Sequence, residues 1–577
     1  MKRLLRAACA LVALAAAAPE FSSPPSARAQ EQKPAQAESA ESRVDKLFAQ
    51  FDKKDSPGCA LAVVREGKTI YKRGYGMADL EHDVPMTPQS VLYIGSTSKQ
   101  FAAASVALLA QQGKLSLDDN VRKYVPELPD YQPPVTIRHL VHHTSGVRDG
   151  WALLSLAGRD ADEVINLDDI VALAARQKSL NFKPGEEHLY SNTGYWLLAV
   201  VVARASGKSL REFADAEIFK PLGMARTVFN DDHTRIIKGR AYGYSPARAG
   251  GFRLSNVNND LVGAGGLWTS VEDLLLWDEN FYTAKVGGPD FVRQLLQPGA
   301  LSDGEKLNYA FGLGLGEFGG LKFVAHGGGL AGYRAELVRF PEQKFSVACL
   351  CNSANADPTA YAKQIVEIYL ADRMKPREQG GAAAASASPQ PVAGEVKLSE
   401  QELSAVAGVY LNRVTETPRR IYLKGGKLYY SRGGANESEL VPLGANRFTM
   451  RGVPGAIEIT FKPRRAGERP SLYFVTDGGK PSVFDPVEAA SYTPAQLNEF
   501  AGDYRSDEID ARYTLAVKDG KLVMRLRSDE APLEPVFADA FNAPGMIFRF
   551  TRAANGRIDG FAVTTGRARR VRFDRVN

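Results

Sequence analysis

The last third of the chain carries the same pattern twice, and this repeat restricts what that part can fold into. Each copy holds short stretches of alternating apolar and polar residues separated by glycine turns, a pattern typical of antiparallel strands. We therefore expect two small antiparallel β-barrels of the lipocalin kind, over residues 398–490 and 491–577. The matching positions lie 94 residues apart: Leu403, Gly408-Val409-Tyr410 and Gly426-Lys427-Leu428 in the first copy, and Leu497, Gly502-Asp503-Tyr504 and Gly520-Lys521-Leu522 in the second.

The segments outside the repeat differ in composition. Residues 376–397 are rich in alanine, glycine, serine and proline, which indicates a flexible linker. A basic start, an apolar run and Ala27-Arg28-Ala29 predict a secretory signal peptide over residues 1–29, followed by a polar leader over residues 30–41. We therefore expect an exported protein, periplasmic or secreted. No stable membrane insertion is expected, because no later stretch approaches ~20 uninterrupted apolar residues.

Residues 42–375 predict one mixed domain. The apolar runs 60–64 and 69–71 are joined by a tight turn and indicate a hairpin, and the runs 336–340 and 345–351 indicate a second. Most of the sequence between the two hairpins is helical in pattern. The expected fold class is α+β, with an antiparallel sheet flanked by helices, a helical subdomain, and a site in the cleft between them.

Ser96 and Lys99 stand just before an apolar stretch, residues 102–110. A helix that begins at about Gly95 places the two side chains on one face, so the lysine can hydrogen-bond the serine hydroxyl. The start of a helix also supplies unpaired N–H groups and a positive dipole end, which favour an oxyanion. By itself this S-x-x-K motif is weak, because a serine near a helix start is usually just a cap.

Two more polar elements follow in order along the chain. Tyr190 and Asn192, one residue apart, supply a phenol and a carboxamide. His326 precedes three glycines that end at Gly329, and glycines let the backbone approach a ligand closely. Three ordered elements favour a nucleophilic site over a chance match.

The order of these elements resembles the penicillin-recognising serine hydrolases of the class C β-lactamase and D-aminopeptidase group over residues 42–375. The segments 142–146, 219–224 and 263–270 extend the resemblance. It implies a β-lactamase-like fold, and the two barrels that follow resemble the D-aminopeptidase architecture. His326 departs from the lysine that β-lactamases and many DD-peptidases carry there. A histidine resembles the aminopeptidase and esterase branch and argues against efficient penicillin hydrolysis.

A serine hydroxyl is a poor nucleophile until a neighbour takes its proton. For Ser96 that base is Lys99, Tyr190, or the two titrating as one unit, and the sequence leaves the three alternatives open. Burial is expected to lower the pKa of Lys99, and the adjacent cation is expected to lower the pKa of Tyr190.

The resemblance also implies the substrate contacts. Asn192 would hold a substrate amide carbonyl, and His326 would bind the substrate. The backbone N–H groups of Ser96 and Gly329 would form the oxyanion hole. No cofactor and no metal are expected.

In D-aminopeptidases a loop from the last barrel reaches into the active site and selects substrates with a free amino end. Here the acidic loop with Asp529, Glu530 and Asp539 is one candidate, because a carboxylate would pair with an ammonium. A solvated surface loop is the commoner role for such residues.

Two other motifs match catalytic or metal sites less well. Residues 243–247 nearly form a nucleophile elbow, but they lack the apolar strand before it and the helix after it. His139, His142 and His143 have metal-like spacing without the interleaved acid of H-E-x-x-H. Structural histidines at a helix end are the favoured interpretation.

The charge balance gives no support to nucleic-acid binding. Residues 1–29 hold four basic residues and one acidic residue, so the formal net charge of +6 falls to +3 after cleavage. The one dense basic cluster, Arg567–Arg572, alternates and predicts a strand with one solvated face. The expected partner is a small-molecule or short-peptide substrate, and the oligomeric state stays open.

Three cysteines remain after cleavage: Cys59, Cys349 and Cys351. The last two share one face of a strand and are poorly placed to pair with each other. Buried free thiols are the favoured state. The resemblance makes the first and last strands of the domain neighbours, which allows a bridge from Cys59 to one of the others.

The sequence thus predicts an exported serine hydrolase that forms an acyl-enzyme on Ser96 and cleaves small amides or esters, with D-amino-acid peptides or amides as leading substrates. Alternatives within the family are an esterase, a DD-carboxypeptidase or a weak β-lactamase. Alternatives of other classes are a non-catalytic penicillin-binding or ligand-sensing module, and barrels that bind a ligand or partner while catalysis is secondary.

Overall fold

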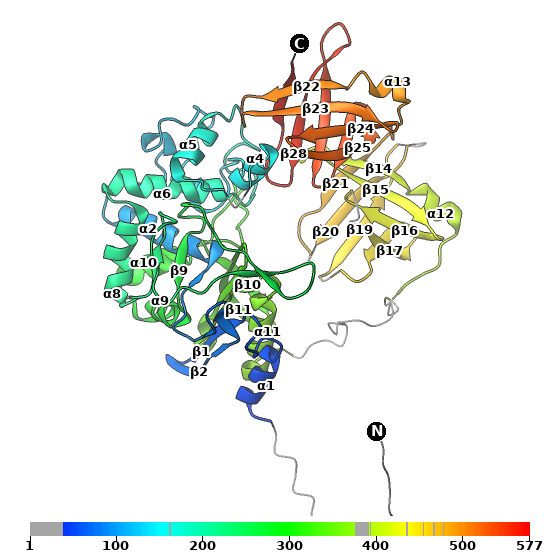
Figure 1. Ribbon diagram of the computed structural model, residues 1–577. Helices are drawn as coiled ribbons and strands as arrows, with labels where there is room; N and C mark the ends of the chain where they lie inside the picture. Colours follow the sequence, from blue (N-terminus) through cyan, green and yellow to red (C-terminus); the bar gives the residue numbers. More distant parts are fainter. Residues whose placement is uncertain are drawn as a thin grey trace, which may run out of the picture.

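The computed structural model describes residues 38–160, 163–375, 392, 394–433, 437–453, 455–465, 468–476 and 478–576 (Figure 1). The predicted signal peptide, and most of the predicted leader and linker, lie outside these residues. Within the described ranges, no helix has the length and apolar character needed to cross a membrane.

The part of the chain before residue 376 alternates between strands and helices. Its strands are β1 (Cys59–Arg65), β2 (Lys68–Tyr75), β3 (Met77–Asp79), β4 (Val84–Pro85), β5 (Leu92–Tyr93), β6 (Val228–Phe229), β7 (Tyr244–Pro246), β8 (Phe252–Leu254), β9 (Leu267–Thr269), β10 (Gly314–Phe318), β11 (Leu321–Leu330), β12 (Tyr333–Phe340) and β13 (Phe345–Cys351). Its helices are α1 (Ala40–Phe48), α2 (Lys99–Gln111), α3 (Ile137–Val141), α4 (Gly150–Leu156), α5 (Leu167–Ala175), α6 (Asn192–Ser206), α7 (Leu210–Ala214), α8 (Lys220–Leu222), α9 (Val271–Thr283), α10 (Gly288–Leu295) and α11 (Pro358–Leu370), with short turns η1 (Gly95–Ser98), η2 (Val121–Lys123), η3 (Asp215–Phe219) and η4 (Pro341–Gln343).

The central sheet has the strand order β10-β11-β12-β13-β1-β2 and is antiparallel throughout. The two predicted hairpins are β1–β2 and β12–β13, and they join because β1 pairs with β13. α1 and α11 cover one face, and α9 lies against the other. The α+β class is therefore confirmed.

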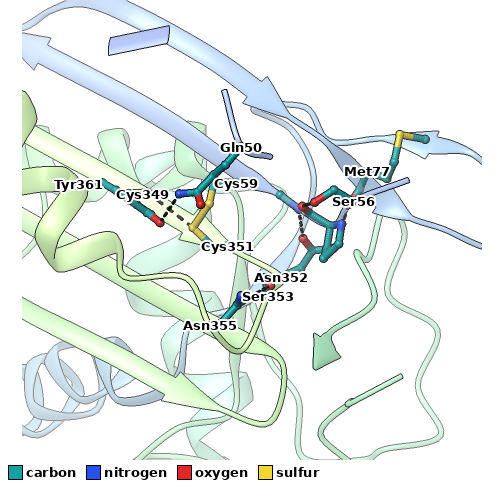
Figure 2. Close-up of a disulfide and its surroundings, with 12 residues drawn as sticks. Gln50, Ser56, Cys59, Met77, Cys349, Cys351, Asn352, Ser353, Asn355 and Tyr361 are labelled. Atoms are coloured by element: carbon teal, nitrogen blue, oxygen red, sulfur yellow. Dashed lines mark hydrogen bonds between the residues drawn. A yellow bond between two sulfur atoms is a disulfide. The ribbon is translucent and has the colours of Figure 1, made fainter. Parts of the chain in front are cut away.

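The cysteines differ from the prediction. Cys59 on β1 and Cys351 on β13 are register partners and form a disulfide (Figure 2). Cys349 is a buried free thiol whose sulfur lies 3.8 Å from that of Cys351. The prediction of free thiols was thus wrong for two of the three cysteines, because pairing depends on the register of two strands far apart in sequence, and a sequence does not reveal that register.

Helix α2 runs through the interior of the domain. Its residues are buried from Lys99 to Leu109 on every side, and it packs against α6, α7 and α10. A helix that is apolar all round belongs in the core. Its first residue is therefore carried into the interior, although that residue is a lysine.

The repeat forms two closed antiparallel barrels. The first contains α12 (Glu400–Ala405), β14 (Gly408–Asn412), β15 (Thr417–Lys424), β16 (Lys427–Ser431), β17 (Glu437–Gly444), β18 (Arg447–Met450), β19 (Ile457–Lys462), β20 (Ser471–Thr476) and β21 (Ser482–Val487). The second contains α13 (Pro494–Leu497), β22 (Gly502–Ser506), β23 (Ala511–Lys518), β24 (Lys521–Leu526), β25 (Asp529–Phe537), β26 (Ala540–Ala543), β27 (Met546–Arg552), β28 (Ile558–Thr565) and β29 (Val571–Arg575).

The two barrels use equivalent residues in the same way. The hydroxyl of Tyr410 donates to the carbonyl of Val406 at 2.8 Å, and the hydroxyl of Tyr504 donates to the carbonyl of Phe500 at 2.9 Å. Both tyrosines are fully buried in their barrels. The prediction of two antiparallel barrels is confirmed.

The second barrel lies against the helical part of the first domain, beside α4 (Figure 1). Its apolar core is continuous with that of the helices. Tyr513 donates a hydrogen bond to the carbonyl of Leu156 at 2.7 Å. The Leu526 side chain lies 3.1 Å from the position that a Cβ on Gly158 would take. The barrel is therefore packed against the first domain rather than tethered loosely to it.

Candidate active site

Ser96 lies in the 3₁₀ turn η1, and Lys99 opens α2. The predicted helix from Gly95 is thus split into a tight turn followed by an α-helix. The ammonium nitrogen Nζ of Lys99 lies 3.1 Å from the Ser96 hydroxyl oxygen, with which it hydrogen-bonds. The predicted serine–lysine pair is formed.

The side chain of Lys99 is fully buried. Its Nζ also donates to Oδ1 of Asn192 at 2.9 Å and to the carbonyl of Ala264 at 2.8 Å. Burial lowers the pKa of Lys99 well below its usual value; Asp149 opposes this shift and Arg567 adds to it. An amine that is neutral near working pH can accept a proton from Ser96.

Asn192 is fixed by Asp149, a residue that the sequence motifs did not identify. One carboxylate oxygen of Asp149 accepts from the backbone N–H of Asn192 at 2.7 Å and from its side-chain Nδ2 at 2.8 Å. Asp149 also caps α4 through the N–H of Ala152. An aspartate before a helix is an ordinary capping signal, so nothing in the sequence marked this one as part of a site.

Tyr190 has the opposite pKa shift to the one predicted. Burial raises its pKa, and a hydrogen bond with Ser96 and the charge of Arg567 offset this only in part. The Lys99 Nζ lies 4.7 Å from the centre of the Tyr190 ring. The prediction was wrong because loss of hydration outweighs the nearby cation, and the phenol stays protonated.

His326 belongs to a chain of buried hydrogen bonds. The backbone N–H of Ser191 donates to Nδ1 of His143 at 3.1 Å, so the proton of that ring is on Nε2, which lies 3.2 Å from the hydroxyl of Tyr309. The same hydroxyl lies 3.1 Å from Nε2 of His326, whose Nδ1 donates to the carbonyl of Gly327 at 2.7 Å.

This chain assigns one neutral tautomer to each ring. Burial, assisted by the charge of Lys99, lowers the pKa of His326 to about 4, and burial lowers that of His143 well below its usual value. The centre of the His143 ring also lies 4.3 Å from that of the Tyr190 ring, and the two ring planes are tilted by 34°. The sequence favoured a structural role for His143 at a helix end. In the structure its ring lies beside Tyr190 and is linked to His326 through the Tyr309 hydroxyl.

The glycines after His326 bring β11 against the serine turn. A Cβ on Gly328 would lie 1.9 Å from the carbonyl oxygen of Ile94, and a Cβ on Gly95 would lie 2.4 Å from the nitrogen of Gly329. Gly95 also has a φ of 53°. Only glycine fits at these two positions, and the backbone nitrogens of Ser96 and Gly329 are thereby held near one another.

The predicted site residues surround one cavity of about 660 Å³. Ser96, Tyr190, Asn192, His326 and Gly329 line it, and Lys99 reaches it through Ser96. Aromatic side chains form much of the remaining wall: Tyr93, Trp151 and Trp196.

A loop of the last barrel does enter this cavity, but it is not the acidic one. Arg567, between β28 and β29, lines the cavity, and its guanidinium carbon lies 4.9 Å from the centre of the Tyr190 ring. Asp529 and Glu530 lie on β25, where Glu530 pairs with Lys518, and Asp539 pairs with Arg552. The acidic-loop hypothesis is therefore wrong.

The basic cluster also differs from the prediction. Arg567 to Arg570 form a loop, with Arg570 at a φ of 55°, and only from Val571 does the chain become the strand β29. The alternation of arginines indicated a strand. The prediction was wrong because the helical subdomain holds this segment as a loop.

The remaining motifs take structural roles. Residues 244–246 are the short strand β7, which pairs with β8, so no nucleophile elbow is formed there. His139 accepts the N–H of Thr136 in a capping box, and His142 lies against the carbonyl of Arg138. Groups of three potential metal ligands within the described residues lie elsewhere: the three cysteines, and Asp79, Glu81 and His82 at the surface.

Comparison with known proteins places this geometry in a family. The Beta-lactamase family model matches residues 44–370. The D-aminopeptidase of Gluconobacter oxydans is 28% identical over 486 residues, which cover 83% of this chain and 85% of that protein. The D-aminopeptidase of Brucella anthropi is 27% identical over 539 residues, which cover 90% of this chain and 95% of that protein.

The fold has a counterpart among solved structures. The octameric penicillin-binding protein homologue from Pyrococcus abyssi is 24% identical, with a TM-score of 0.53 over 77% of this chain and 99% of that one. The family match spans more than half of this chain and contains the Ser96, Lys99 and Tyr190 cluster. The chain therefore belongs to the β-lactamase family of penicillin-recognising serine hydrolases.

Proposed function

We propose that this protein is an exported hydrolase that forms an acyl-enzyme on Ser96 and cleaves small amides of D-amino acids. The observation that carries the proposal is the buried Lys99 amine, hydrogen-bonded to Ser96 and held at a lowered pKa. The D-amino substrate class is supported by the D-aminopeptidases, which this chain matches over most of their length.

In the acylation step, the neutral Lys99 amine takes the proton of the Ser96 hydroxyl while the oxygen bonds to the substrate carbonyl carbon. The N–H groups of Ser96 and Gly329 stabilise the resulting oxyanion. The C–N bond then breaks, and the leaving amine takes the phenol proton of Tyr190, which the Lys99 ammonium replaces.

Deacylation reverses these roles. Water attacks the Ser96 ester, its proton passes to Lys99, and the serine oxygen recovers a proton as the acid leaves. Asn192 has both amide ends fixed, with Oδ1 toward Lys99 and one Nδ2 hydrogen toward Asp149. Its second Nδ2 hydrogen is available to hold the substrate carbonyl.

A matched panel tests the reaction. D-alanyl and L-alanyl p-nitroanilides, an N-acylated D-alanyl analogue, a p-nitrophenyl ester and nitrocefin are offered to the enzyme, to Ser96→Ala and to Ser206→Ala, a serine at the far end of α6. We expect turnover of the D-alanyl anilide that is lost only in Ser96→Ala. Turnover of the ester or the blocked analogue alone would replace the proposal by an esterase or carboxypeptidase. No Ser96-dependent turnover would favour a ligand-binding module.

Export is tested separately. The full-length chain is expressed in a Gram-negative host, and the periplasmic fraction is analysed by N-terminal sequencing. We expect a mature chain that begins near Gln30. Retention of the uncleaved chain in the cytoplasm would remove export from the proposal and leave the hydrolase untouched.

A further inference from the structure

The loop that carries Arg567 is held firmly at the cavity. The carbonyl oxygen of Arg567 accepts from the backbone N–H of Asp149 at 3.1 Å and from Nδ2 of Asn181 at 3.0 Å. The next residues add further contacts: the N–H of Arg569 donates to Asn181 Oδ1 at 2.7 Å, and its guanidinium pairs with Glu187 at 2.9 Å. The backbone of Arg567 is thus positioned without any help from its side chain.

The guanidinium of Arg567 has unused donors. It lies over the Tyr190 ring, and among the described residues no group accepts a hydrogen bond from it or forms an ion pair with it. By contrast, Arg569 forms a two-pronged pair with Glu187. A planar guanidinium on a fixed backbone, facing a cavity, matches a carboxylate.

A second donor on the same cavity is also without a partner. Asn259 lines the cavity and is 5% exposed. Its Oδ1 accepts from the N–H of Leu261 at 3.3 Å, but its Nδ2 has no partner among the described residues. A buried donor in a native protein normally has an acceptor, so this atom indicates a ligand rich in acceptors.

The charges on the cavity wall favour an anion. Arg334 and Arg567 both line it, against one carboxylate, Asp357, which already caps α11 through the N–H of Ala360. Burial keeps the imidazole of His326, also on the wall, neutral by lowering its pKa to about 4.

We propose that the substrate carries a carboxylate and that Arg567, supplied by the last barrel, binds it. This inference rests on the proposed function in that it concerns the substrate of the Ser96 site. The barrel loop would then select peptides with a free acid over the same peptides without one.

Binding is measured by calorimetry on the Ser96→Ala protein, which requires no turnover. The ligands are D-alanyl-D-alanine and its C-terminal amide, which differ in one charge. The variants are Arg567→Gln, Arg567→Lys and the control Arg557→Gln. The control removes an exposed arginine in the turn between β27 and β28. We expect the acid to bind at least about tenfold more tightly than the amide.

Arg567→Gln should reduce that preference to about twofold or less, Arg567→Lys should keep part of it, and Arg557→Gln should keep it all. Equal affinity for the two ligands, no measurable binding of either, or a preference that survives Arg567→Gln would overturn the proposal. If the acid preference holds while the hydrolysis panel fails, only the proposed function falls. If the panel succeeds and the preference is absent, only this inference falls.

Discussion

The carboxylate of Asp149 holds Asn192 at two points, its backbone nitrogen at 2.7 Å and its Nδ2 at 2.8 Å. This leaves Oδ1 of Asn192 facing Lys99 at 2.9 Å. The backbone N–H of the same aspartate binds the carbonyl of Arg567. Asp149 therefore links Lys99, the carboxamide of Asn192 and the loop of the last barrel.

Replacing Asp149 should reduce activity more than stability. In Asp149→Ala the Asn192 amide can rotate, and we expect kcat/KM to fall by about tenfold or more, since buried donors and acceptors at the lysine lose their partners. Because Asp149 opposes the lowered pKa of Lys99, its removal should also move the acidic limb of the pH profile to lower pH.

The control is Asn166→Ala, which removes the N-cap of α5, an exposed cap in the same subdomain. Asn166→Ala should lose roughly 1 kcal/mol of stability through its cap. Asp149→Ala should lose more, because two N–H donors of the buried Asn192 also lose their acceptor. If Asp149→Ala loses no more activity than Asn166→Ala, Asp149 acts only as a helix cap.

Lys99 gives a pH-dependent stability with a defined sign. Its pKa is lowered in the folded state, so between the folded and the unfolded pKa values the unfolded chain binds one more proton at this site, and the folded state gains stability as pH rises. Relative to Lys99→Met, the free energy of unfolding of the natural protein should rise by about 1.4 kcal/mol per pH unit above the folded pKa.

This gain ends near the unfolded pKa of about 10.4. Chemical denaturation of both proteins from neutral pH to about pH 9 measures the difference, which cancels the titration of all other groups. A difference that does not change with pH would mean that Lys99 remains an ammonium in the folded protein and is not the base.

The residues that were found from the sequence share one property: each lies in a short local motif. Ser96 and Lys99 are three residues apart, and Tyr190 and Asn192 are two apart. The repeat likewise predicted the barrels because equivalent tyrosines recur at a fixed interval.

The residues that were missed depend on contacts between distant segments. Asp149 meets Asn192 only when the loop before α4 folds onto α6, and Arg567 reaches Tyr190 only when the second barrel docks. The Cys59–Cys351 bridge depends on strand register in the same way. The pKa of Tyr190 was misjudged because its burial is a tertiary property.

The hydroxyl of Tyr309 joins two buried imidazoles. Tyr309→Phe leaves Nε2 of His143 without an acceptor and Nε2 of His326 without a donor. We expect a loss of about 1–3 kcal/mol in stability and about tenfold in kcat/KM. Tyr131→Phe, which removes one hydroxyl bonded to the carbonyl of Gln177, should leave kcat/KM unchanged.

The rate and its pH profile separate a structural role of Tyr309 from a role in positioning the two imidazoles. With the pKa of His326 at about 4, the natural enzyme should show no ionisation of this ring between about pH 5 and 8. Because burial is the main cause of that lowered pKa, Tyr309→Phe should reduce the rate without adding a limb in this range. Equal profiles and equal rates in all three proteins would rule out a positioning role for Tyr309.

The disulfide predicts a single reactive thiol. Among the described cysteines only Cys349 is free, so the mature, unfolded and unreduced chain should take up one alkyl group, measured by intact mass. Removing the bridge with Cys59→Ala and Cys351→Ala should cost about 2–5 kcal/mol, because it closes a separation of 292 residues. Cys349→Ala, the matched control, should keep the bridge. Three alkylated thiols would contradict the pairing.

The buried pair of Arg148 and Glu508 attaches the second barrel to the helical subdomain. Their side chains are 0% and 3% exposed, and NH1 of Arg148 lies 2.5 Å from Oε2 of Glu508. The same guanidinium donates to the carbonyls of Arg569 and Arg570 in the loop that carries Arg567. Breaking this pair should therefore act on stability and on the cavity together.

We expect Arg148→Met to cost about 3–5 kcal/mol, because it leaves the Glu508 carboxylate buried and unpaired. Adding Glu508→Gln should recover part of that loss, since the isolated charge is gone. Arg204→Met, which removes an exposed partner of Glu127, should cost about 0–1 kcal/mol. Urea unfolding of these four proteins and of Glu508→Gln alone measures these differences. Strict additivity of the Arg148 and Glu508 substitutions would show that the two side chains do not stabilise the junction as a pair.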